Sequence, residues 1–498
     1  MKRTLDRLTG QVPMYKLVVA SLAALTAVAL VLSLFGQLSY GPLALLASLG
    51  VAVASAWLTG WLAAIIVRTT FHPESSVITG LLIFAIMQPT IEPLGLAGIA
   101  LASTIASASK YLLAIRGRHI FNPAAVGALV VGIIGLSYPA WWIGTPYLLA
   151  VIAIGAFLVL YRTQKLAMAG VFLGIAFAVF AVVVALRGGT FADWMSLAVL
   201  SSPLVFLAGF MLSEPLTLPP RRWQQFLVAT IVALLVAVPF SLPANKYLFA
   251  LLVGNLIAFA FGQRRAIRLT YVGRKLIGPA TFELTFQPNR PVRFVPGQYM
   301  ELTIPHRKAD FRGSRRYFSV ASAPTADGPI TFAITVPSKA SSFKAALLSL
   351  EPGARVNGTG VGGDFALPAD TRQPLLLIAG GIGITPFASQ LAHHASDNRD
   401  VTVLYATSAA GDLPYRELLE GSGARVVLFA PETPASLPAG WTYAGAGRIT
   451  GERISENVRD AASRRAFVSG PPAFVSELRG ALKSLGVKRV HTDAFSGY

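Results

Sequence analysis

The chain has 498 residues, of which 54% are hydrophobic and 13% are charged, and its formal net charge is +19. This composition is too apolar for an ordinary soluble protein and indicates an integral membrane part. Basic loops that orient membrane helices explain the positive charge better than nucleic acid does, because no basic run is interleaved with aromatic residues. The chain has no cysteine, which excludes disulfides and cysteine-ligated iron–sulfur clusters within it.

Apolar segments suited to a bilayer recur through the first part of the chain, residues 1–265. We predict about ten membrane-spanning helices there. The third and fifth are short or interrupted by Pro89 and Pro123, and Pro203 interrupts the eighth. The predicted spans are 17–36, 41–67, 77–89, 94–115, 121–140, 146–161, 166–186, 195–213, 223–242 and 247–263.

The basic residues of this helical part predict its orientation. An even number of spans places both termini on one side of the membrane, and nearly all Lys and Arg residues of the part fall on that side. Only Arg187 and Lys246 fall opposite. By the positive-inside rule that side is the cytoplasm. We therefore predict a multi-pass protein of the inner (cytoplasmic) membrane, with both termini and residues 266–498 in the cytoplasm.

Two stretches of the helical part, 79–90 and 207–217, resemble each other. Each is an apolar run with a glycine near its start that ends in a polar residue, a proline and then a threonine. Paired, interrupted segments build midplane sites in many transport-type folds, although two proline-terminated helices can also look alike by chance. Polar residues inside a span are costly and often functional. His119, Asn122 and Glu214 are our candidates for a flavin or ion pathway, with helix capping or solvation as the alternative.

The histidine count of the helical part argues against one class of membrane reductase. A ferric reductase or NADPH oxidase uses four helix histidines to ligate two haems. This part has only His72 and His119, each at a predicted span end. We therefore expect no haem, and the chain offers no set of metal ligands.

Three segments of the helical part carry a family resemblance. ITGLL (78–82), HIFNPAAVGALVV (119–131) and GFMLSEPLT (209–217) resemble the NqrB/RnfD family, the membrane components of sodium-translocating NADH:quinone reductase and of the Rnf complex. The resemblance implies an inverted repeat of helices that carries flavin. Members of that family attach FMN to a threonine in a Ser/Thr-Gly-Ala-Thr motif, which this chain lacks, and Thr145 is the one threonine offered in its place. A second flavin, FMN or riboflavin, would then be bound non-covalently.

From Ala266 the pattern changes to short, β-rich segments separated by turns that contain Gly and Pro. This pattern predicts an antiparallel β-barrel over 266–370. Within it, SRRYFSVASAP (314–324) resembles the flavin signature of the ferredoxin–NADP reductase family, Arg-x-aromatic-Ser/Thr. A guanidinium forks onto phosphate oxygens, so Arg316 is predicted to bind the FAD diphosphate.

The same resemblance assigns the neighbouring residues. It places Phe318, with Tyr317 beside it, against the isoalloxazine ring, and the hydroxyl of Ser319 on flavin N5, the atom that accepts hydride. KASSFKAAL (339–347) follows at the expected distance, so Ser341 and Ser342 are predicted to cover the diphosphate.

Residues 371–498 predict an α/β domain that binds a pyridine nucleotide. PLLLIAGGIGITPFASQL (374–391) is a buried strand, a glycine-rich turn and a helix start, a pattern that brings backbone amides to a diphosphate. Its order with VTVLYATS (401–408) and AFVSGPPAFVSELRGAL (466–482) resembles the nucleotide lobe of the same reductases. The residues predicted to contact the nucleotide are Gly380, Gly381, Gly383, Thr385, Pro386, Gly470 and Pro471, with Ser469 beside the nicotinamide where relatives carry cysteine.

Two further features concern cofactor choice and the C-terminus. NADP-specific members of that family place a cation after the YATS position, where this chain has Ala409, Ala410, Gly411 and then Asp412. NADH is therefore favoured over NADPH, unless Arg416 or Arg448 reaches the nucleotide. C-terminal aromatic residues cover the flavin in that family, and Phe495 and Tyr498 take this place here.

The sequence thus predicts a membrane-bound, FAD-dependent NAD(P)H dehydrogenase. Hydride passes from the nucleotide to FAD, and single electrons pass into or across the membrane to a quinone or an extracytoplasmic flavoprotein. A hydrocarbon layer of about 30 Å is too thick for one electron hop, which is why a second flavin is expected near 119–131 and 209–217. The alternative is an ion or solute transporter whose reductase domain regulates or energises it.

Overall fold

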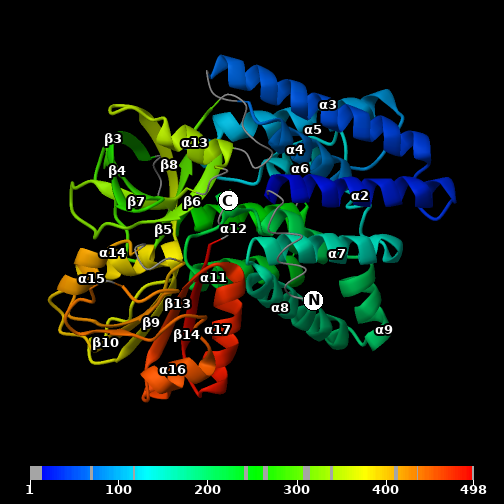
Figure 1. Ribbon diagram of the computed structural model, residues 1–498. Coiled ribbons are helices and arrows are strands. Elements are labelled where there is room, and N and C mark those ends of the chain that lie inside the picture. The colour runs from blue at the N-terminus through cyan, green and yellow to red at the C-terminus, as the bar shows by residue number, and fades with distance from the viewer. Residues whose placement is uncertain are drawn as a thin grey trace. The chain divides into compact units, whose positions relative to one another are not determined.

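The computed structural model describes residues 14–67, 71–115, 118–240, 245–261, 267–306, 314–336, 340–408, 413–434 and 436–495. The chain divides into two compact units at the boundary between Arg265 and Ala266. We call them the helical unit and the reductase unit (Figure 1).

Proline sets where many helices of the helical unit begin. Its fixed φ suits the first helical position, where no intrahelical partner is needed for its missing N–H. Five α-helices start at a proline: α3 (Pro42–Ile66), α4 (Pro73–Ile86), α5 (Pro93–Leu112), α6 (Pro123–Ile133) and α7 (Pro146–Arg162). The other long helices are α2 (Met14–Leu34), α8 (Leu166–Leu186), α11 (Arg222–Ala237) and α12 (Lys246–Phe261).

Between α8 and α11 the chain forms a broken helix. It consists of α9 (Phe191–Trp194), the π-helix η1 (Met195–Leu200), α10 (Leu204–Phe206), the π-helix η2 (Leu207–Leu212) and the 3₁₀ turn η3 (Pro215–Thr217). The two parts on either side of Pro203 differ in direction by 41°. A short hairpin, β1 (Ala114–Ile115) and β2 (Arg118–His119), precedes α6.

The structure does not support about ten spans. Among the described residues, α2, α3 and α8 are long and apolar enough to cross a membrane, and the bent pair is a fourth if it counts as one span. Most of the other predicted spans correspond to helices of 11 to 17 residues, and α5, with 20 residues, is not apolar enough. Helix α6, for example, has 11 residues and is about 16 Å long, against a hydrocarbon layer of about 30 Å.

The helices nevertheless form two sets of five with matching contacts. In the first set α5 packs on α3 and α6, and in the second set α11 packs on α8 and α12. Helix α2 packs on its counterpart α7. The similar stretches 79–90 and 207–217 occupy corresponding places, because one ends α4 and the other ends the broken helix.

The barrel of the reductase unit is a sheet in the order β6-β5-β8-β3-β4-β7, with every pair antiparallel. A bridge between Val320 and Phe332 joins the end of β6 to β7 and closes the sheet on itself. Phe286, Met300 and Phe332 are fully buried inside it. The strands are β3 (Ile267–Gly278), β4 (Thr281–Pro288), β5 (Tyr299–Thr303), β6 (Arg315–Ser319), β7 (Ile330–Thr335) and β8 (Arg355–Gly362), and α13 (Ser342–Leu348) precedes β8.

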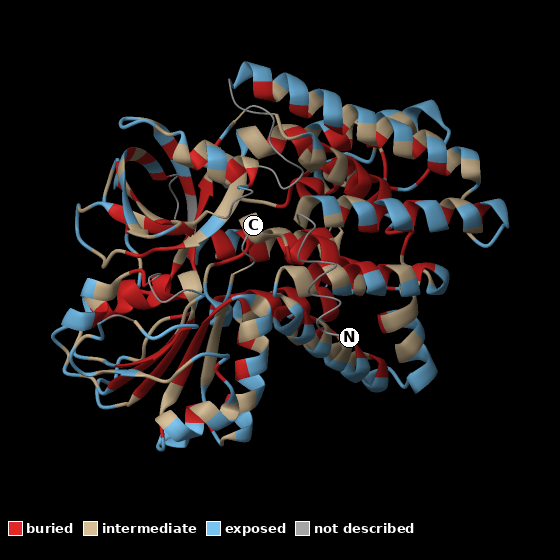
Figure 2. Ribbon diagram, viewed as in Figure 1, coloured by how far each residue is buried: buried red, intermediate tan, exposed pale blue. Residues whose placement is uncertain are grey.

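The nucleotide lobe is a six-stranded parallel sheet in the order β12-β11-β10-β9-β13-β14. Continuous apolar runs such as LLLIA and VTVLY form its central strands, as expected of strands covered on both faces, and these strands are buried (Figure 2). The strands are β9 (Leu375–Gly380), β10 (Val401–Ala406), β11 (Arg425–Phe429), β12 (Trp441–Tyr443), β13 (Arg465–Gly470) and β14 (Val490–Ala494). The helices are α14 (Thr385–His393), α15 (Arg416–Gly421), α16 (Gly451–Asn457) and α17 (Pro472–Ser484).

Helix α14 ties the lobe to the barrel. The hydroxyl of Ser389 donates to the carbonyl of Ser322, 2.6 Å away, and the amide of Gln390 donates to the carbonyl of Phe365. Both side chains are fully buried. The strand that carries the flavin signature and the sheet that carries the glycine-rich turn therefore meet within one compact unit.

Candidate functional site

The strand order of the lobe defines a site at the carboxyl ends of β9 and β13. These neighbours lead to opposite halves of the sheet, and a crevice for a nucleotide forms at such a switch point. The turn GGIG follows β9, and Gly470 and Pro471 end β13. Two segments that the sequence singled out separately are thus adjacent, with Ser469 paired in register with Ala379.

The glycines of the turn do different things. Gly381 has φ +55°, a left-handed conformation that favours glycine, and open space lies where a Cβ would project. At Gly383, by contrast, a Cβ would lie 2.3 Å from the carbonyl oxygen of Ser469. Gly381 leaves room for a ligand to approach the backbone, whereas Gly383 lets the turn pack on β13.

We expect Gly383→Ala to destabilise the reductase unit by about 1–3 kcal/mol, because the new methyl group meets backbone that cannot rotate away. The measurement is the urea-unfolding midpoint of the full chain in detergent. The matched control is Gly480→Ala in α17, where nothing lies within 4 Å of the added carbon and Ala stabilises a helix interior. Equal midpoints for the two variants would contradict this account of the turn.

Thr385 and Pro386 open α14, as the sequence predicts. The hydroxyl of Thr385 donates to the carbonyl of Ile382 at 2.8 Å, and Thr385 is only 3% exposed. Its side chain therefore fastens the turn. A contact with the nicotinamide stays a prediction for both residues.

Ser469 has an unsatisfied hydroxyl. The residue is fully buried, and its Oγ has no hydrogen-bond partner within the described part of the chain. An unpaired buried polar group costs about 1–3 kcal/mol, so it suits a site that a ligand completes. This fits a nicotinamide-binding position at the end of β13.

We expect Ser469→Ala to leave the thermal unfolding midpoint of the free protein unchanged or raised, because it removes an unsatisfied group. It should nonetheless slow reduction of the bound flavin by the nucleotide. Both are measured on the same purified protein. A clear fall in the midpoint would show that the hydroxyl has a structural role instead.

The structure adds a residue that sequence reasoning missed, Asp493. It lies on β14, in register with Ser469, and the hydroxyl of Ser319 lies 3.4 Å from its Oδ2. Burial raises the pKa of this carboxyl to about 6, against a smaller lowering by the hydrogen bond from Ser319. The contact joins the predicted N5 ligand to the nucleotide lobe. The sequence does hold one signal for Asp493, because this carboxyl lies two residues before Phe495, the aromatic residue predicted to cover the flavin.

The four residues of the flavin signature divide between the two faces of β6. Arg316 and Phe318 both lie against Phe343 of α13, the guanidinium 5.2 Å from the ring centroid and Phe318 stacked at 5.9 Å. Tyr317 is 56% exposed and makes an edge contact with Tyr299. Successive strand residues point to opposite faces, so the exposed aromatic on the Ser319 face is Tyr317. Which ring covers the flavin stays a prediction.

The predicted diphosphate segment lies close to Arg316. Ser341 caps α13 by accepting from the amide of Lys344. Ser342 contacts His306, a residue that the sequence did not single out: His306 Nε2 lies 3.0 Å from the Ser342 hydroxyl and Nδ1 lies 2.8 Å from the carbonyl of Ile304. Since a carbonyl only accepts, Nδ1 carries the proton.

The predictions for the ends of the lobe meet the structure in part. Phe495 is described, and its amide donates to the carbonyl of Gly470 at 2.9 Å, which brings it to the end of β13. Tyr498 and Asp412 lie outside the described residues. Arg416 pairs with Glu420 at 2.6 Å.

In the helical unit the structure brings together the three polar residues that the sequence singled out. His119 Nε2 lies 3.1 Å from one carboxylate oxygen of Glu214, and the amide of Asn122 donates to the other at 3.0 Å. Asn122 also caps α6, and its backbone N–H donates to Asn255 of α12, which sequence reasoning missed. Helix capping, the alternative we left open, thus describes part of what Asn122 does. Their role in a flavin or ion pathway stays a prediction.

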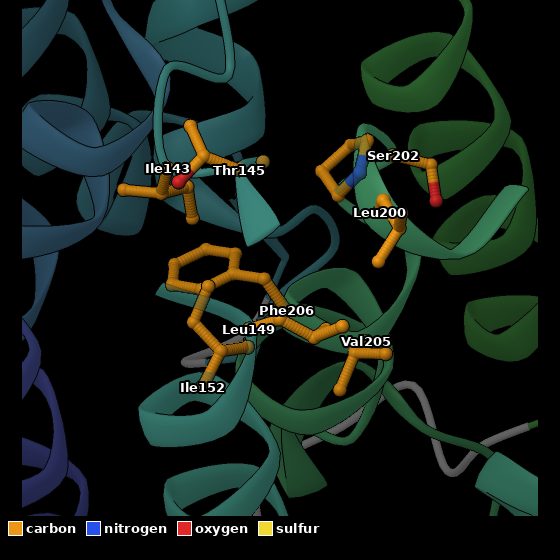
Figure 3. Close-up of a pocket in the computed structure, with 10 residues that line it drawn as sticks. Ile143, Thr145, Leu149, Ile152, Leu200, Ser202, Val205 and Phe206 are labelled. Atoms are coloured by element: carbon orange, nitrogen blue, oxygen red, sulfur yellow. The ribbon is translucent and has the colours of Figure 1, made fainter. Parts of the chain in front are cut away.

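A small pocket, with a volume of about 10 Å³, lies at the break of the bent helix. Figure 3 shows Ile143 and Thr145 on one side of it and Leu200 and Ser202 on the other. The hydroxyl of Thr145 is buried and has no partner among the described residues. The walls are otherwise mainly apolar.

The reductase unit is similar in sequence to known proteins. Residues 377–479 match the family described as "Oxidoreductase NAD-binding domain". The chain is 29% identical over 219 residues to a flavohemoprotein of Bordetella pertussis, a match that covers 41% of this chain and 53% of that protein. It is also 29% identical over 215 residues to the ferredoxin reductase component of 3-ketosteroid-9-alpha-monooxygenase of Mycolicibacterium smegmatis, covering 41% and 56%.

Among solved structures, an Amycolatopsis cytochrome P450 reductase matches with a TM-score of 0.40 and 26% identity, covering 46% of this chain and 70% of that one. The chain thus spans about half the length of the curated relatives that it matches. The C-terminal region is thus similar to reductases of the ferredoxin–NADP reductase kind, in agreement with the prediction of an FAD-dependent NAD(P)H oxidoreductase.

The same names correct one prediction. We expected electron partners without haem, either a quinone or an extracytoplasmic flavoprotein. The relatives are instead a flavohemoprotein and a ferredoxin reductase component. The exclusion of haem rested on histidines within this chain, which say nothing about a haem held by a partner. The prediction was therefore wrong.

Proposed function

We propose that the protein is a membrane-bound NAD(P)H dehydrogenase. Its reductase unit takes hydride from NAD(P)H onto FAD, and single electrons leave through the helical unit. The observation that carries the proposal is the meeting of Ser319 with Asp493 at the switch point, beside the orphan hydroxyl of Ser469. Bound FAD would accept two electrons as a hydride and release them one at a time.

The chain's own residues position the reactants and handle a proton. The open backbone at Gly381 and the hydroxyl of Ser469 receive the nucleotide. Arg316, beside α13, holds the flavin diphosphate. The hydroxyl of Ser319 contacts Asp493, so with FAD bound at the flavin signature this hydroxyl would pass a proton between the flavin and the carboxylate. Ionised Asp493 also stabilises the positive charge that develops on the nicotinamide ring as hydride leaves.

We propose that the helical unit lies in the cytoplasmic membrane with the reductase unit in the cytoplasm. Two observations support this. Among the described residues, only five of the large exposed hydrophobic residues come after Phe261, and the many that precede it give the helical unit an apolar surface that suits lipid. The Lys and Arg residues of the helical unit also lie at or between the ends of its apolar segments, as in the basic loops that face the cytoplasm. The five are Val272, Leu276, Val295, Tyr317 and Leu437.

We include in the proposal a second, non-covalently bound flavin, FMN or riboflavin, near His119, Asn122 and Glu214. The support is that segments 92 residues apart converge there on one carboxylate. The two sets of helices meet at the same place, since Asn122 belongs to the first set and Glu214 and Asn255 to the second. This arrangement is consistent with the inverted repeat that the sequence resemblance implies.

The experiment uses the full chain in lipid vesicles with cytochrome c, a one-electron haem acceptor, trapped inside. NADH or NADPH is added outside, and reduction of the trapped protein is followed. The proposal predicts reduction that depends on the nucleotide. Trapped cytochrome c that stays oxidised, while cytochrome c added outside is reduced, would refute electron passage through the helical unit.

Matched variants sharpen this test. His119→Ala and Glu214→Gln should slow reduction of the trapped acceptor and spare the outside reaction, because both belong to the helical unit. Lys165→Gln is the control. It removes a polar contact of the same unit, the hydrogen bond that Lys165 donates to Gln225 at 2.9 Å, and it should leave both reactions unchanged. Loss of both reactions in the His119 and Glu214 variants would instead indicate misfolding.

Transport is the second candidate, and the matched contacts of the two helix sets favour it. Solute or ion uptake by the same vesicles that persists in Arg316→Ala would support transport independent of the reductase. Uptake that is lost when the variant loses its flavin would argue against independent transport and favour electron transfer as the role of the helical unit.

A further inference from the structure

A glycine-rich segment of the nucleotide lobe, Ala444–Arg448, lies at the edge of the sheet where the nucleotide is proposed to bind. It follows β12, which is parallel to β11 and so ends at the same edge as β9 and β13. Nucleotides bind at the carboxyl edge of such sheets. No part of the proposed hydride-transfer site uses this segment.

One half-buried arginine, Arg453, holds the segment by its carbonyl groups. Arg453 Nη1 donates to the carbonyls of Ala446, at 2.9 Å, and Arg448, at 3.3 Å. Its Nη2 donates to the carbonyls of Ala444 and Gly445. The guanidinium lies 4.6 Å from the ring centroid of Phe429, the last residue of β11. Four carbonyls of one short segment therefore point inward at a single guanidinium.

The backbone amides of the segment, unlike its carbonyls, are not engaged by Arg453. None of the amides of residues 445–448 has a hydrogen-bond partner among the described residues. Gly445 has φ +89° and Gly447 has φ +106°. These backbone conformations belong to neither a helix nor a strand, so no regular hydrogen-bond pattern engages the amides of the segment. Successive backbone N–H groups in such turns form concave sites for anions. The side chain of Arg448 is exposed beside them and has no partner within the described part of the chain.

The position selects the anion. Strand β12 is the third strand from β9, so the segment lies about 14 Å from the glycine-rich turn at a strand spacing of about 4.8 Å. The turn at β9 takes the diphosphate. A dinucleotide laid from there across β10 and β11 brings its adenosine ribose toward the segment, and the phosphoryl group on that ribose is the 2′-phosphate.

We propose that residues 444–448, with the guanidinium of Arg448, bind the 2′-phosphate of NADPH. The proposal rests on the proposed function and deepens it by naming NADPH as the preferred donor. It revises the preference for NADH, which depended on the lack of a cation directly after β10. Arg416, the other cation considered, is occupied by Glu420.

Calorimetric titration of the purified full chain with 2′,5′-ADP and with 5′-AMP tests the proposal without the reaction. Wild type should bind 2′,5′-ADP at least about tenfold more tightly, the effect of one charge-assisted contact. Arg448→Ala should remove that difference and leave 5′-AMP unchanged, whereas Arg416→Ala should keep it. Unchanged thermal unfolding shows that the variants fold, and Arg448→Lys should restore part of the difference.

The proposal falls if wild type binds the two nucleotides equally, if Arg448→Ala weakens both alike, or if Arg416→Ala removes the difference. Reduction of the bound flavin by NADH and by NADPH is measured in the same preparation. Flavin that is reduced without any preference would overturn this inference and leave the proposed function intact. Flavin that neither nucleotide reduces would overturn the proposed function itself.

Discussion

Replacing Asp493 by Asn should slow reduction of the bound flavin by NAD(P)H about 10- to 100-fold. The loss corresponds to a charge-assisted hydrogen bond worth about 1.5–3 kcal/mol. Asp493 contacts Ser319. Because Asn has nearly the same shape as Asp, the variant removes the negative charge and keeps a side chain of the same size at this contact. The measurement is anaerobic stopped-flow absorbance of the flavin after mixing with the nucleotide.

The pH profile separates this role from a structural one. Burial raises the pKa of Asp493 to about 6, so the carboxyl is mostly protonated at pH 5 and mostly ionised at pH 7. The ionised form is the active one, and the wild-type rate should therefore rise with pH through about 6. Asp493→Asn should show no such rise. The control is Asp400→Asn, an exposed residue paired with Arg464 at 2.8 Å, and a profile that is equally flat in wild type would contradict the account.

Replacing Arg316 by Ala should weaken FAD binding about 10- to 100-fold, because a guanidinium contributes about 1.5–3 kcal/mol to a bound phosphate. Arg316 lies against Phe343 at the start of α13, next to the segment predicted to cover the diphosphate. The measurement is equilibrium titration of flavin-free full chain with FAD. Arg316→Lys should recover part of the affinity, since it keeps the charge and loses the fork.

Riboflavin distinguishes a phosphate contact from general damage to the site. It carries the ring without a phosphate, so its affinity should be the same for wild type and Arg316→Ala. Arg315→Ala is the matched control, because its side chain leaves the opposite face of β6. A variant that loses riboflavin and FAD equally would show that Arg316 supports the barrel and not the diphosphate.

The reductase unit is the part that the sequence predicted well. Alternating β-rich segments and Gly/Pro turns predicted the barrel, and LLLIAGGIGITP predicted a buried strand, a turn and a helix start, all of which the structure contains. Short-range periodicity determines these elements, so they can be read from the sequence. The pairing of Ser319 with Asp493 could not, because it joins strands 174 residues apart and depends on the strand order of both sheets.

The helical unit is the part whose elements the sequence predicted less well. Hydropathy indicates apolar segments but not where each helix ends. In the described part of the chain, the predicted spans correspond to three helices long and apolar enough to cross a membrane, a bent pair, and helices that are shorter or less apolar. Prolines such as Pro123 and Pro215 set those ends. The sequence singled out the polar residues next to them, Asn122 and Glu214, and the structure brings the two together. Their convergence with Asn255 depends on how α6 packs on α12, which no local pattern encodes.

The most direct test of the central claim is a flavin count and anaerobic reduction of the purified full chain in detergent. The account predicts that FAD is bound to the reductase unit and is bleached by NAD(P)H, and that acid releases all flavin from the protein. Protein that binds no FAD, or bound FAD that neither NADH nor NADPH reduces, would contradict it.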